Sequence, residues 1–190
     1  KINGAPLLVK CLEAHGVEFI FGIPGAKIDA VFDALVDSKI KLIVCRHEQN
    51  AAFIAASYGR ITGKPGVVLV TSGPGVCNLT TGLLTATTEG DPVIAIGGNV
   101  PLSMQLKETH QGTDNVSILS SATKYCVEAK SVDTISEVVD NAFRYALKPR
   151  AGAAFISMPQ DISLTKTSLG APKPAALISF GSALGQDIEA

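Results

Sequence analysis

The sequence predicts an α/β fold of three layers, in which a mostly parallel six-stranded sheet carries helices on both faces. Apolar, β-branched runs alternate with helical patterns about six times along the chain, which is the arrangement of right-handed βαβ units. The runs at 67–70 and 93–96 are also free of polar residues. Such runs are expected of parallel strands that are buried on both faces.

The first half of the chain is expected to hold two strands and three helices. Asn3 is a plausible N-cap for the first helix, and Gly16 ends its apolar pattern. We expect strands at 17–21 and 40–44, both followed by polar or glycine-rich residues, and we interpret the second as buried. A helix rich in small residues then begins near Glu48.

The second half repeats the alternation and adds a long polar loop. A single helix is expected over 76–89, after the strand at 67–70. The polar stretch 97–112 follows the next strand, and a loop of this length in a compact domain is more often functional than idle. The remaining predictions are a short helix at 116–119, a strand at 125–127, a helix at 135–147 and a strand at 153–158.

Composition indicates a globular protein and excludes several classes. The 190 residues are 46% hydrophobic and 17% charged, and they fit one domain over 1–163, with 164–190 as a linker and the start of a missing central domain. Basic and acidic residues, 16 and 17 in number, are interspersed, so no nucleic-acid partner is expected. No segment has the pattern of a membrane span or signal peptide, and the four scattered cysteines form no metal motif, so a cytoplasmic location is expected.

Three loops follow predicted strands and should meet at one edge of the sheet. They are 22–26, 45–47 and 71–75, and the second leads directly to Glu48. In open parallel sheets the crevice beyond the carboxyl ends of the strands binds ligands. The two glycine loops lack both GxGxxG and GK[ST], so each alone is equally well explained as a tight turn. A flat ring could lie against glycine backbones, because no side chain intervenes.

Glu48 has both a functional and a structural interpretation. A carboxylate in the first turn of a helix is stabilised by roughly 0.3–1 kcal/mol through the helix dipole, with no function implied. The apolar residues that follow Glu48 predict burial, and a buried carboxylate needs a partner. A ligand nitrogen, Arg46 or His47 could each supply it. His47 and His110 could serve as acid–base groups or as structural histidines, whereas His15 is expected at a helix carboxyl end.

Three motifs resemble the amino-terminal pyrimidine-binding domain of thiamine-diphosphate enzymes, and among these the acetolactate synthases. They are FGIPGAKID at 21–29, RHEQNAAF at 46–53 and ITGKPGVVLVTSGPG at 61–75. Shorter matches at 109–112, 123–125 and 158–161 extend the resemblance to about 7–161. Ile23 and Ala26 stand where biosynthetic relatives usually have an aromatic residue and a second glycine, which favours the catabolic, FAD-independent type.

The resemblance implies roles for six residues. Glu48 matches the glutamate that hydrogen-bonds the pyrimidine ring nitrogen and so activates the cofactor, and Gln111 matches a glutamine that reaches toward the reaction centre. The positions that line the pyrimidine are matched by Pro24, Gly25, Thr71 and Asn78. The implied reaction condenses two pyruvates to 2-acetolactate with release of CO2.

The resemblance also implies that half of the site lies elsewhere. The family binds diphosphate and Mg²⁺ with a Gly-Asp-Gly motif in another domain, and here Pro92 follows Gly90-Asp91, so no metal ligand is assigned. A homodimer or tetramer with the cofactor at the subunit interface is implied, and the isolated chain should be inactive. Two alternatives remain: another thiamine-diphosphate enzyme, such as pyruvate oxidase or a 2-oxoacid decarboxylase, and a non-catalytic α/β interaction module.

Overall fold

Six parallel strands form one sheet in the computed structural model, which describes residues 1–170. The order across the sheet is β3-β2-β4-β5-β7-β6. The strands are β2 (Phe19–Gly22), β3 (Lys41–Val44), β4 (Gly66–Val70), β5 (Val93–Asn99), β6 (Tyr125–Glu128) and β7 (Ala153–Pro159). Every neighbouring pair is parallel, which confirms the predicted fold class.

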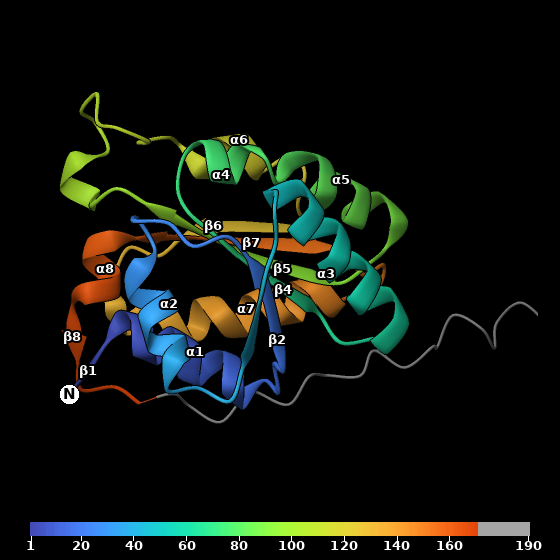
Figure 1. Cartoon of the computed structure of the whole chain (residues 1–190), viewed down its shortest axis with the longest axis horizontal. Helices are drawn as coiled ribbons and strands as arrows, with labels where there is room; N and C mark the ends of the chain where they lie inside the picture. Colours follow the sequence, from blue (N-terminus) through green and yellow to red (C-terminus); the bar gives the residue numbers. More distant parts are fainter. Residues whose placement is uncertain (171–190) are drawn as a thin grey trace, which may run out of the picture.

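Helices cover both faces of the sheet (Figure 1). One face carries α1 (Gly4–Ala14), α2 (Asp29–Val36) and α7 (Ile135–Leu147), and the other carries α3 (Glu48–Thr62), α4 (Pro74–Cys77), α5 (Thr80–Glu89) and α6 (Asn115–Leu119). Alternate residues of β5 enter different cores: Ile94 packs with the first group of helices and Val93 with the second. This alternation explains why the central strands consist of apolar residues on both faces.

The small residues of α3 let it lie close to its neighbours. Ala51, Ala52, Ala55 and Ala56 are buried on one side of the helix. A Cβ on Gly59 would lie 2.3 Å from the carbonyl oxygen of Pro92, just before β5. Another backbone therefore approaches α3 closely at this glycine.

The segment 40–44 contains a strand as predicted, but the prediction that this strand is buried is wrong. Among the described residues, strand β3 lies at the edge of the sheet and pairs only with β2. Leu42 packs against the first core, whereas Ile43 and Val44 are 42% and 64% exposed. Apart from Lys41 the segment is apolar like the central strands, but its edge position leaves most of its side chains exposed within the described residues.

The helix predicted over 76–89 is interrupted. The N–H of Leu79 donates to the carbonyl oxygen of Val76, three residues back, which ends α4 before α5 begins. Asn3 is the N-cap of α1 but makes no side-chain cap bond. The short elements are the 3₁₀ helices η1 (Leu102–Met104) and η2 (Val132–Thr134), the helix α8 (Gln160–Leu164), and the antiparallel pair β1 (Ile2–Asn3) and β8 (Lys166–Thr167).

Strand β8 lies within the predicted linker. Its pairing with β1 holds residues 166–167 against the amino terminus of the domain. Residues 171–190, the rest of the predicted linker and domain start, lie outside the described residues. Within the described part of the chain, no helix combines the length and apolarity needed to span a membrane.

Candidate functional site

The carboxyl ends of the parallel strands bring the predicted loops to one edge of the sheet. The loop after β2 and the loop after β4 come from adjacent strands and touch. A Cβ on Gly25 would lie 2.5 Å from the Cβ of Thr71. Only glycine permits this approach, so Gly25 joins the two loops.

Glu48 begins α3 beside these loops. His47 is the N-cap, and its Nδ1 accepts a hydrogen bond of 3.1 Å from the backbone N–H of Gln49. The Oε2 of Glu48 accepts a hydrogen bond of 2.9 Å from Nδ2 of Asn78. A Cβ on Gly75 would lie 3.4 Å from Oε1 of Glu48. The structure thus brings Glu48, Asn78 and the 71–75 loop together.

The environment of Glu48 differs from the expectation of burial. Its side chain is half-buried, and no ion pair joins it to the exposed Arg46 among residues 1–170. In the same part of the chain, no donor bonds to its Oε1. Within the described residues, the carboxylate therefore keeps one oxygen for a further partner.

Gln111 reaches the same place from the segment between β5 and α6. Gln111 and Gly73 both have left-handed backbones, with φ of 62° and 59°. A Cβ on Gly73 would lie 3.0 Å from the carbonyl oxygen of Gln111. Gln111 is thus in contact with the 71–75 loop, although thirty-odd residues separate the two along the chain.

The other candidates take different positions. Pro24 is exposed beside Gly25, and His110 is exposed in the long segment. His15 is the C-cap of α1, at the helix carboxyl end where it was expected. Its Nε2 lies 2.6 Å from Oδ1 of Asp140, and its ring stacks on Phe143 at 3.9 Å. In the described part of the chain, no three His, Cys, Asp or Glu side chains are grouped to hold a metal ion.

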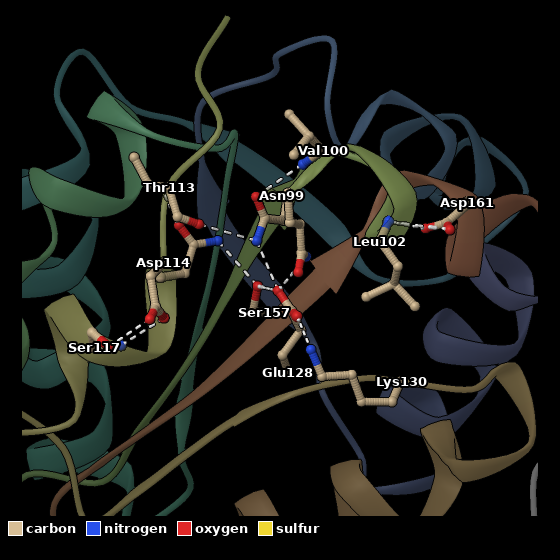
Figure 2. A network of polar contacts seen from close by, with 12 residues as sticks. Asn99, Val100, Leu102, Thr113, Asp114, Ser117, Glu128, Lys130, Ser157 and Asp161 are labelled. Atoms are coloured by element: carbon tan, nitrogen blue, oxygen red, sulfur yellow. Dashed lines mark hydrogen bonds and ion pairs between the residues drawn. The ribbon is translucent and has the colours of Figure 1, made fainter. Parts of the chain in front are cut away.

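One polar cluster was not predicted from the sequence. Glu128, at the carboxyl end of β6, has only 8% of its side chain exposed and accepts hydrogen bonds from several elements (Figure 2). Burial raises the pKa of the Glu128 carboxyl, but hydrogen bonds from Lys130 and three neutral donors outweigh burial and hold that pKa below its ordinary value. The sequence feature that could have indicated this cluster is Ser157, a polar residue within the apolar run of β7.

Comparison with known proteins identifies the family. Residues 2–118 match the thiamine pyrophosphate enzyme N-terminal TPP binding domain, and the chain belongs to this family. It is 56% identical to the acetolactate synthase of Bacillus subtilis over 98% of this chain and 34% of that protein. It is 59% identical to the catabolic acetolactate synthase of Raoultella terrigena over 84% of this chain and 29% of that protein.

A more distant relative is also an acetolactate synthase. The large subunit of acetolactate synthase isozyme 2 from Escherichia coli is 39% identical over 88% of this chain and 31% of its own length. The chain spans about a third of the length of the curated relatives it matches.

The residues at the strand ends fit the pyrimidine part of thiamine diphosphate. The unpartnered Oε1 of Glu48 can accept from or donate to a ring nitrogen, according to its protonation. Thr71 Oγ1 and Ser72 Oγ are buried without a hydrogen-bond partner in the described residues. Such hydroxyls are costly and are retained where a loop has a role beyond packing.

Proposed function

We propose that this chain is the pyrimidine-binding part of a thiamine-diphosphate-dependent acetolactate synthase. The supporting observation is the half-buried carboxylate of Glu48, which lies beside loops that the family match includes. Asn78 holds one of its oxygens, and the other has no hydrogen-bond partner within residues 1–170. The relatives named acetolactate synthase support the same activity.

Within this proposal, each residue has a physical task. Thiamine diphosphate, when bound, supplies a nucleophilic carbon that adds to 2-oxoacids. Glu48 exchanges a proton with the pyrimidine ring nitrogen, Asn78 orients its carboxylate, and the half-buried position limits competition from water. Pro24, Gly25 and Thr71 form the wall of the pyrimidine site, and Gln111 reaches toward the substrate.

The finer parts of the proposal concern the whole enzyme. Pyruvate is the substrate, and two molecules give 2-acetolactate with release of CO2. Mg²⁺ and the diphosphate are held by residues outside this chain, FAD is not required, and the cofactor lies at the interface of a homodimer or tetramer in the cytoplasm.

Replacement of Glu48 tests the proposal in the full-length protein. Glu48→Gln keeps the shape and the bond from Asn78 but removes the ionisable group, so 2-acetolactate formation should fall by about 10²–10⁴-fold, the usual contribution of an acid–base group. Glu18→Gln is the matched control, because Glu18 is exposed and, in the part of the chain that the structure describes, its side chain pairs only with Lys64. The assay measures CO2 and 2-acetolactate from pyruvate.

Three results would contradict the proposal. Full turnover in the Glu48→Gln variant would leave a non-catalytic module as the better interpretation. Acetaldehyde as the product would indicate a decarboxylase, and acetyl phosphate with hydrogen peroxide would indicate an oxidase. Calorimetry with thiamine diphosphate and Mg²⁺ shows whether either substitution affects cofactor binding itself.

A further inference from the structure

Glu128 gathers donors from three separate elements at one carboxylate oxygen. Its Oε2 accepts hydrogen bonds from Nδ2 of Asn99 at 2.7 Å, from Nε2 of Gln105 at 2.9 Å and from Oγ of Ser157 at 3.0 Å. Asn99 ends β5 and Ser157 lies in β7, while Gln105 belongs to the segment that follows β5. Hydrogen bonds to an ionised group are the stronger ones, so this oxygen is a firm anchor.

The same cluster ties down both ends of the segment 100–113 (Figure 2). Nδ2 of Asn99 also donates to the carbonyl oxygen of Thr113 at 3.3 Å, which closes the segment on itself. The hydroxyl of Thr113 donates to Oδ1 of Asn115, and Nδ2 of Asn115 donates to Ser157 and to the carbonyl oxygen of Gly98. The base of the segment is therefore fixed by side chains whose bonds converge on Glu128.

Apolar packing supports the start of the segment, where Val100 is buried and Leu102 packs against the first core, but it does not extend to the middle. Leu106, next to Gln105, is fully exposed. Beside the bond between Gln105 and Glu128, a pocket of ≈ 530 Å³ lies between the segment and β6, and residues of both line it. Because a pocket takes the place of a packed interface here, the path of the segment depends on hydrogen bonds such as those from Asn99 and Gln105 to Glu128.

We propose that Glu128 is a positioning residue that holds the segment 100–113 so that Gln111 stays against Gly73 at the thiamine-diphosphate site. The inference rests on the proposed function for the role of Gln111, but the anchoring itself rests on the bonds to Asn99 and Gln105. Glu128 does not touch the site, and it acts through the segment.

Amide hydrogen exchange in the full-length protein tests the anchoring without any turnover. Glu128→Ala and Gln105→Ala each remove bonds to a charged group, so the amides of 106–112 should exchange about 10–100-fold faster. Amides of α7 should be unchanged. Lys130→Met is the control and should leave exchange in 106–112 unchanged, because among the described residues the exposed Lys130 bonds only to the other oxygen, Oε1. Gln105→Ala carries the test alone if Glu128→Ala fails to fold.

Kinetics then test whether the effect passes through Gln111. Glu128→Ala should lower kcat by about tenfold or more and leave KM for pyruvate nearly unchanged, because misplacement of a group at the reaction centre affects the rate. In a Gln111→Ala background, Glu128→Ala should cost nothing further. Unchanged exchange in 106–112, or effects of the two substitutions that multiply, would overturn the inference. The exchange result stands even if Glu48→Gln remains active, so the two proposals fail separately.

Discussion

Replacement of Gly59 by alanine sets two opposing effects against each other in α3. Alanine is favoured over glycine within a helix by about 1 kcal/mol. Against this gain, the new Cβ would lie 2.3 Å from the carbonyl oxygen of Pro92, a backbone atom that cannot swing away. Overpacking of this kind costs about 1–3 kcal/mol, and a backbone obstacle belongs at the upper end of that range. We therefore expect Gly59→Ala to destabilise the protein by about 1–2 kcal/mol.

Equilibrium urea unfolding of the chain measures the effect. With a slope near 2 kcal/mol per molar urea, typical of a domain of this size, the midpoint should fall by about 0.5–1 M with the slope unchanged. Ser57, on the exposed face of the same helix, provides the control. Ser57→Ala should be more stable than Ser57→Gly by about 0.8–1 kcal/mol, which reports propensity alone. If Gly59→Ala raises the midpoint as well, the close approach of α3 to Pro92 is not a real constraint.

Two further predictions follow from the titratable groups. Because the pKa of Glu128 is lowered on folding, its stabilising contribution is fully present above the ordinary value of 4.5 and is lost as the pH falls through the lowered folded value. The free energies of unfolding of the wild type and of Glu128→Gln should therefore converge as the pH is lowered. A difference between the two that stays constant with pH would refute the lowered pKa. Among the cysteines, the exposed Cys77 should react fastest with iodoacetamide and the buried Cys11 slowest, because burial raises the pKa of the Cys11 thiol despite its bond to Ser136. Timed alkylation followed by mass spectrometry checks the order, and equal rates would contradict it.

Local pattern was sufficient for most elements of the fold. The helix predicted at 135–147 is α7 to the residue, and the runs at 67–70 and 93–96 are central strands. In these segments propensity, periodicity and burial agree, because each is covered on the side that its pattern requires. The contact between the 22–26 and 71–75 loops also followed from parallel strands alone, since their carboxyl ends must share an edge.

The failures arise where position in the sheet matters more than composition. Residues 40–44 are apolar except for Lys41, yet β3 is an edge strand, and the segment's apolar residues do not specify its place in the strand order. Gln111 was assigned only by resemblance, because its left-handed backbone and its contact with Gly73 depend on how a long segment returns to the sheet.

The sequence by itself determined the alternation of strands and helices, the glycines at the strand ends and the single carboxylate at the start of α3. Only the tertiary structure decided which oxygen of Glu48 stays free and which residues meet at Glu128. The physical reason is separation along the chain: Asn99, Glu128 and Ser157 belong to three strands, and hydrogen bonds among them exist only after the sheet has set their order.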